Sequence, residues 1–181
     1  MLSEKIKDAT KTGHLKLEKI VVRELKSIRS NNDYAAFLWK FYIYFSQVER
    51  TIAPYINDRL LPDYAERRNS SYLKADIESL GASINETPVV EVPVISNTVA
   101  AFGALYVMEG SIMGGRIIIQ MLEKLGIEDG LSFFSGYGQE TGQKWGLFTK
   151  VMNETATTRE DEEQAIDTAN ETFHLFEKVF V

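Results

Sequence analysis

Cysteine is absent from this 181-residue chain, and histidine occurs only twice, as His14 and His174. A protein without cysteine cannot form disulfides, thiolate zinc sites or a cysteine nucleophile. Hydrolase motifs are missing as well, since no G-x-S-x-G elbow or serine–histidine pairing occurs. Any imidazole chemistry therefore has at most two positions in the sequence.

Basic residues are fewer than acidic ones, and the chain has no long uninterrupted apolar run. Lysine and arginine total 20 against 26 acidic residues, which gives a net charge of −6 and disfavours a broad nucleic-acid-binding surface. The apolar stretches near residues 99–108 and 117–122 are interrupted by Gly, Glu, Arg or Gln. Neither a membrane span nor a secretory signal is expected, and we predict a soluble cytoplasmic protein.

The remaining composition is that of a folded globular protein. Hydrophobic residues make up 44% of the chain and charged residues 25%, a balance that argues against disorder. The length corresponds to one domain, residues 1–181.

Apolar residues recur with helical spacing throughout, so the sequence predicts an all-α fold. Two prolines, Pro88 and Pro93, indicate an extended connection near residues 82–95. Helices are expected over the following residues: 3–28, 34–52, 63–80, 97–125, 143–153 and 158–180.

One face of the first helix carries a candidate binding site. At about 100° per residue, Lys7, Lys11, His14 and Glu18 lie within roughly one sixth of a turn of each other. The i,i+4 spacing of His14 and Glu18 allows the carboxylate to accept a hydrogen bond from the imidazole, which leaves the other ring nitrogen free to bind a metal. The alternative is a solvated helix face, and a lone histidine in such a pattern more often belongs to one.

The fourth predicted helix is unusually rich in glycine, with the sequence GALYVMEGSIMGGRIII. Each glycine in a helix costs roughly 0.5–1 kcal/mol relative to alanine. Gly103, Gly110 and Gly114 lie on nearly one line along the helix, and Gly115 follows. Such a stripe permits a kink and lets a flat group approach the backbone; close helix–helix packing explains it equally well.

The two features together point to a tetrapyrrole site. A porphyrin between them would have an axial histidine on one face and an open side on the other.

At these residues the sequence resembles the biliverdin-producing heme oxygenases. The segment IKDATKTGHLKLE resembles the family's N-terminal signature, and GALYVMEGSIMGGRIII resembles its distal-helix signature with a G-x-x-x-G-G core. The sequence YVMEGSIMGG, followed by FFSGYG and Trp145, is most similar to that of bacterial members, including those associated with bacteriophytochromes.

The resemblance implies an all-α heme-oxygenase-like bundle that binds heme as both cofactor and substrate. His14 matches the proximal iron ligand, Glu18 its hydrogen-bond partner, and Lys7 a propionate contact. We expect Lys11 to meet the same anionic edge. Gly110 and Gly114 match the distal glycines over the heme face, and Gly115 beside them is expected to contact the heme as well.

The resemblance also implies the reaction, which is cleavage of heme by O2 to biliverdin, CO and Fe²⁺. The electrons come from an external ferredoxin or reductase, and a bacteriophytochrome pathway is one use of the product. Ser111 stands where mammalian-type members have an aspartate that organises distal water; a hydroxyl can still hold a water. Lys144 and Lys150 lie in the helix that matches the C-terminal propionate clamp.

Two other interpretations of the sequence compete with this one. A non-catalytic heme or tetrapyrrole carrier would share His14 and the glycines. A di-iron oxidase is suggested by the Glu171-x-x-His174 spacing, but His14 belongs to no second such motif because position 11 is lysine.

Overall fold

The computed structural model describes residues 1–181 and contains helices but no strands. The all-α prediction is confirmed. The elements are α1 (Leu2–Ser27), α2 (Asn31–Ile52), α3 (Ser70–Ser79), α4 (Thr98–Gly110), α5 (Ile112–Lys124), α6 (Thr141–Thr155) and α7 (Arg159–Lys178), with 3₁₀ turns at Tyr64–Glu66 and Gly138–Glu140.

Helix starts follow the capping residues in the sequence. The side chain of Asn97 accepts a hydrogen bond from the Ala100 amide at the start of α4. Thr158 and Asp161 form a capping box at the start of α7. Each cap satisfies backbone amides that have no partner within the helix, and the predicted starts near residues 97 and 158 are therefore confirmed.

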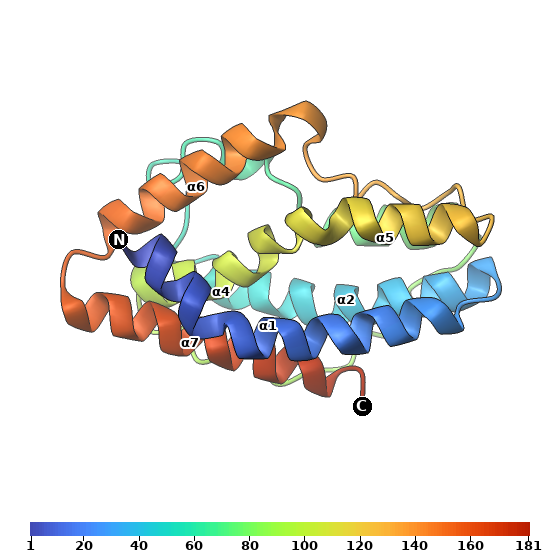
Figure 1. Ribbon diagram of the computed structural model, residues 1–181, viewed down its shortest axis with the longest axis horizontal. Coiled ribbons are helices and arrows are strands. Elements are labelled where there is room, and N and C mark those ends of the chain that lie inside the picture. Colours follow the sequence, from blue (N-terminus) through green and yellow to red (C-terminus); the bar gives the residue numbers. More distant parts are fainter.

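Helix α7 joins α1, α2 and α4 into one bundle. It packs against both α1 and α4, and Figure 1 shows it running beneath α1. The Tyr44 hydroxyl of α2 donates 2.7 Å to the buried Thr172 carbonyl of α7. Phe41 of α2 packs edge to face on Phe176 of α7, with ring centroids 5.0 Å apart. One hydrophobic core of 38 buried residues results.

The expected third helix, residues 63–80, is wrong in its first part. Only a short 3₁₀ turn forms at Tyr64–Glu66, and α3 begins after its N-cap Asn69. The intervening Arg67 is extended, with φ −75° and ψ 148°. This conformation turns Arg67 and Arg68 inward, where they are only 3% and 6% exposed.

The expected fourth helix, residues 97–125, is also interrupted. A break at Ser111 divides it into α4 and α5, and the bend is visible in Figure 1. Gly110, Gly114 and Gly115 surround the break, and their low helix propensity makes this the weakest part of the segment.

The segment Thr98–Lys124 is long and apolar enough to cross a membrane, with a mean hydropathy of 1.3 in its most apolar window. Half of that window is buried inside the protein. Core helices of soluble proteins satisfy the same length and composition criterion, and here the segment contributes to the core.

Two glycines on this segment differ in what surrounds them, which gives a matched test. A Cβ at Gly103 would lie 2.3 Å from the Ala165 carbonyl oxygen of α7, whereas a Cβ at Gly114 would meet nothing within 4 Å. We expect Gly103→Ala to lower the free energy of unfolding by about 1–3 kcal/mol through overpacking. Gly114→Ala should leave it unchanged or raise it by up to about 1 kcal/mol.

Urea unfolding of both variants measures the difference. Equal stability of the two would show that α4 and α7 are not in this close contact.

Candidate functional site

His14 lies in the middle of α1 with an exposed imidazole. Its ring meets the Phe173 ring of α7 edge-on, with centroids 5.8 Å apart. Gly13 allows this approach, because a Cβ there would already lie 3.3 Å from the Cβ of Phe173. The ring thus rests on α7, and no protein group hydrogen-bonds to its nitrogens, which remain available to a ligand.

The expected hydrogen bond between Glu18 and His14 does not form in this structure. Both side chains are exposed, and water competes for both groups. A pair of this kind on a helix surface contributes only about 0.2–0.5 kcal/mol. Glu18 remains one turn away on the same face, so its role as partner to the imidazole stays a prediction.

The lysines of α1 are divided between two faces. Lys5 pairs with Glu162, and Lys16 pairs with Glu177 at 2.8 Å, so these two tie α1 to α7. Lys7 and Lys11 are exposed and form no ion pair. Two unneutralised ammonium groups therefore share the face of His14, and an anionic ligand can approach them there.

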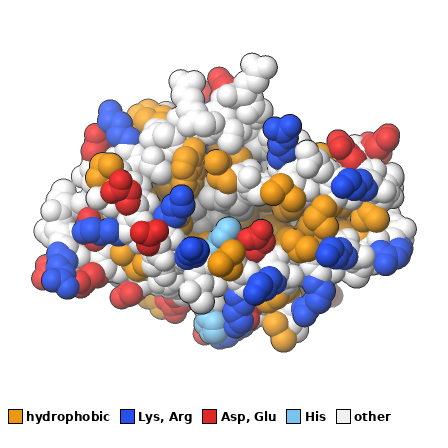
Figure 2. All heavy atoms as spheres, in the orientation of Figure 1, with side chains coloured by type: hydrophobic (Ala, Val, Ile, Leu, Met, Phe, Trp, Pro, Cys, Tyr) orange, Lys and Arg blue, Asp and Glu red, His pale blue; other side chains and the backbone are white.

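Gly110 and Gly114 leave part of the α4–α5 surface without side chains. A Cβ at Gly110 would lie 3.7 Å from the Trp145 ring of α6, and Gly114 faces open space. In Figure 2 this side of the molecule is hollowed, with hydrophobic side chains along the hollow and lysine or arginine side chains at its edge. A flat group can approach the backbone closely at Gly114, whereas at Gly110 the Trp145 ring already lies against it.

Gly115 does not share this exposure. A Cβ there would lie 2.1 Å from the Phe134 carbonyl oxygen, so the residue is a packing contact between α5 and the loop before α6. The structure thus gives Gly115 a different role from the predicted contact with a bound heme. Close packing therefore explains Gly103 and Gly115, whereas the contact of Gly110 and Gly114 with a heme stays a prediction.

Lys144 forms an ion pair within the protein. Its ammonium pairs with Asp63 at 3.0 Å, and its side chain is only 14% exposed. It is therefore not available to a propionate in this structure, because Asp63 already neutralises it. Lys150 is 70% exposed and lies 3.9 Å from Glu154, so its expected role as an anion contact is untested.

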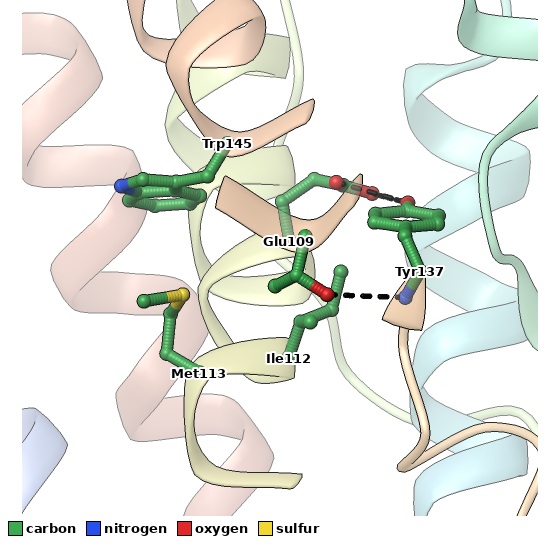
Figure 3. A pocket seen from close by; sticks show the side chains of 6 residues that line it. Glu109, Ile112, Met113, Tyr137 and Trp145 are labelled. Carbon is green, nitrogen blue, oxygen red and sulfur yellow. Dashed lines mark hydrogen bonds between the residues drawn. The ribbon is translucent and has the colours of Figure 1, made fainter. Parts of the chain in front are cut away.

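A buried ionic network lies behind the α4–α5 break. Glu109, 3% exposed, accepts a hydrogen bond of 2.6 Å from Arg67 and one of 3.0 Å from the Tyr137 hydroxyl. Arg67 also donates to Asp63 at 2.8 Å. Figure 3 shows Tyr137 and Glu109 in contact on one side of a small cleft, with Trp145 and Met113 on the other.

These contacts shift the ionisation of their members. Burial, together with the Glu109 charge, raises the pKa of Tyr137, so it remains a neutral hydrogen-bond donor. Burial also acts to raise the pKa of Asp63, but hydrogen bonds and charges from Arg67 and Lys144 outweigh it and hold the pKa below its usual value.

Ser111 belongs to the same buried region. Its hydroxyl donates a hydrogen bond of 2.6 Å to the Met108 carbonyl and accepts one of 2.7 Å from Arg68. One lone pair remains for a water, and the predicted distal role of Ser111 stays a prediction.

The sequence did not predict a site role for the residues of this network and of the cleft, namely Arg67, Arg68, Glu109, Tyr137 and Trp145. One signal was present, because Glu109 is a single carboxylate at the end of an apolar helix. Such a group needs a buried cationic partner. Nothing local in the sequence shows that the partner is 42 residues away.

Comparisons with known proteins identify the family of this chain. The heme oxygenase family profile matches residues 1–181. The chain therefore belongs to the heme oxygenase family, whose activity is the oxidative cleavage of heme to biliverdin.

Individual relatives are bacterial and distant. Heme oxygenase PigA of Pseudomonas aeruginosa is 23% identical over 176 residues, which cover 96% of this chain and 88% of that protein. A heme oxygenase of Xanthomonas campestris pv. campestris is 27% identical over 145 residues, covering 79% and 86%.

A solved structure shares the fold. The NO- and CO-bound heme oxygenase of Neisseria meningitidis superposes with a TM-score of 0.86 at 22% identity, covering 99% of this chain and 90% of that one. The expected heme-oxygenase-like bundle is confirmed.

The lowered pKa of Asp63 predicts a specific pH dependence. The folded-state pKa lies below the unfolded value, so the stabilisation is present above the unfolded pKa and is lost as pH falls through the folded one. Asp63→Asn should lower the free energy of unfolding by about 1–3 kcal/mol at pH 7, and the difference from wild type should shrink below about pH 4.

Urea unfolding at several pH values gives this difference, and Asp129→Asn on an exposed turn is the control. A difference between wild type and Asp63→Asn that does not change with pH would contradict the lowered pKa.

Proposed function

We propose that this chain is a biliverdin-producing heme oxygenase in which heme lies between α1 and the α4–α5 break. The observation that carries the proposal is the face of α1, where the unpartnered imidazole of His14 shares a surface with the unpaired Lys7 and Lys11. The α4–α5 backbone would face the other side of the macrocycle, uncovered at Gly114 and with the Trp145 ring beside Gly110.

The residues fit an iron porphyrin by chemistry as well as by shape. His14 would bind the iron through a neutral imidazole nitrogen. Lys7 and Lys11 would pair with the propionates, which matters in a protein whose net charge of −6 opposes an anionic ligand. When bound, heme supplies the iron that binds and reduces O2 and the meso carbon that is oxidised.

The chain itself contributes position and exclusion. The backbone at Gly114 admits a flat group closely, while Trp145 and Met113 narrow the space beside it. This wall favours attack at one meso carbon by steric exclusion of the others. The free lone pair of Ser111 would hold a water that donates protons at the distal side.

The reaction requires partners that the chain does not contain. We propose O2 as co-substrate and a ferredoxin- or reductase-type electron donor, with the protein acting in the cytoplasm. Supply of biliverdin to a bacteriophytochrome remains an expectation drawn from the wording of residues 106–115.

A non-catalytic heme carrier is the second candidate, because it would use the same histidine and glycines. A di-iron site receives no support from the geometry: no three His, Asp or Glu side chains are grouped to hold a metal, and His174 is exposed.

Titration with hemin followed by ascorbate or a ferredoxin system under air tests the proposal. We expect wild type to develop a Soret band that decays into a biliverdin spectrum with release of CO. His14→Ala should lose this conversion because the axial ligand is gone, and His174→Ala, which alters the other histidine, should retain it.

A stable Soret band in wild type would instead indicate a carrier. Absence of any Soret band would contradict heme binding altogether.

The lysine assignment predicts a charge effect on affinity. Lys7→Glu should weaken hemin binding by about fivefold, since reversing one charge beside a propionate costs on the order of 1 kcal/mol. Lys19→Glu makes the same change on the same helix but on a different face, about 140° from His14, and should have a smaller effect.

Fluorescence quenching of the tryptophans on titration with hemin measures both dissociation constants. Equal constants for the two variants would remove Lys7 from the site.

A further inference from the structure

Arg68 connects three segments behind the α4–α5 break. One terminal nitrogen, Nη2, donates a hydrogen bond of 3.0 Å to the Met108 carbonyl and one of 2.7 Å to the Ser111 hydroxyl. The other, Nη1, donates 2.6 Å to the Phe133 carbonyl. The guanidinium also lies 3.7 Å from the centre of the Phe133 ring. A single side chain thus contacts the end of α4, the break and the loop before α6.

One of the groups that Arg68 contacts, the Met108 carbonyl, lies at the end of α4, where it accepts from Arg68 and from the Ser111 hydroxyl. The last four carbonyls of a helix have no amide four residues ahead within that helix, and Met108 lies in the last turn of α4. Buried carbonyls of this kind cost free energy unless they are hydrogen-bonded. The rigid fork of an arginine can satisfy several at once.

Burial of this charge is otherwise unfavourable. Arg68 is 6% exposed, and burial lowers its pKa, while the nearby carboxylates of Glu109 and Glu49 act in the opposite direction. Unlike Arg67, it forms no direct ion pair. Its polar contacts instead go to the break, to the end of α4 and to the loop.

The segments that Arg68 joins also carry the proposed distal wall. Gly110 ends α4 and faces Trp145, while Gly114 lies on the other side of the break and faces open space. The loop held through Phe133 continues to Phe134, whose carbonyl packs against Gly115. The angle between α4 and α5 therefore sets where Gly110, Met113 and Gly114 stand relative to one another.

We propose that Arg68 is a positioning residue that fixes the angle of the α4–α5 break and thereby the meso carbon at which heme is opened. The inference rests on the proposed heme oxygenase function. Arg68 acts through the wall and does not touch the substrate. Displacements of about 1 Å in such a wall are enough to change reaction rates by about 100-fold.

The test compares Arg68→Met, which removes all three hydrogen bonds, with Arg68→Lys, which keeps the charge and part of the donor set. Tyr44→Phe is the matched control, because it removes a buried hydroxyl-to-carbonyl bond between α2 and α7 away from the break. Arg68→Lys keeps the test available if Arg68→Met does not fold.

The first readout is hydrogen exchange in the heme-free proteins. We expect amides of residues 108–116 to exchange at least about tenfold faster in the Arg68 variants and at the wild-type rate in Tyr44→Phe. The second readout is the ratio of biliverdin isomers. One isomer should dominate in wild type and Tyr44→Phe, whereas the Arg68 variants should give a mixture and a lower kcat with little change in KM.

The outcomes separate the two levels of the argument. A wild type that forms no biliverdin overturns the proposed function and this inference with it. A wild type that forms one dominant isomer, with Arg68 variants that keep the same isomer ratio, overturns the role of Arg68 alone. Unchanged exchange at residues 108–116 in Arg68→Lys overturns it as well, because the break would then be held by other contacts.

Discussion

The break between α4 and α5 is the constraint on which the rest of the site depends. A helix that presents bare backbone at Gly110 and Gly114 gives up helix propensity, roughly 0.5–1 kcal/mol at each glycine. Such a segment must be held by tertiary contacts. Here these are buried hydrogen bonds from arginines, one from Arg67 to the Glu109 carboxylate and one from Arg68 to the Met108 carbonyl. The exposed glycine backbone on the hollow side therefore depends on the buried contacts on the other side of the break.

The lysines of α1 differ in the same way between those that pair within the protein and those that do not. Lysines on one side, Lys5 and Lys16, are neutralised by glutamates of α7 and fix the helix in place. Those beside His14 are left unpaired, so a protein that is acidic as a whole keeps a locally positive surface. The face that fixes α1 to α7 therefore differs from the face on which we propose that heme binds, and lysines occur on both.

Local rules were sufficient for most of the fold. The caps at Asn97 and Thr158 and the apolar spacing predict where α4 and α7 begin. The glycine stripe permits a kink in residues 97–125 but does not place the break at Ser111. Local rules also fail at Arg67, whose partner Glu109 is 42 residues away. The site followed the same rule: the histidine face of α1 could be predicted from spacing, whereas the pairing of Lys144 depends on Asp63 across the fold.

The most direct measurement of the central claim is a crystal structure of the hemin complex. The account predicts iron bonded to a ring nitrogen of His14, one porphyrin face against the backbone of Gly110 and Gly114, and propionates beside Lys7 and Lys11. Iron bound through His174, or a porphyrin seated away from the α4–α5 break, would contradict it.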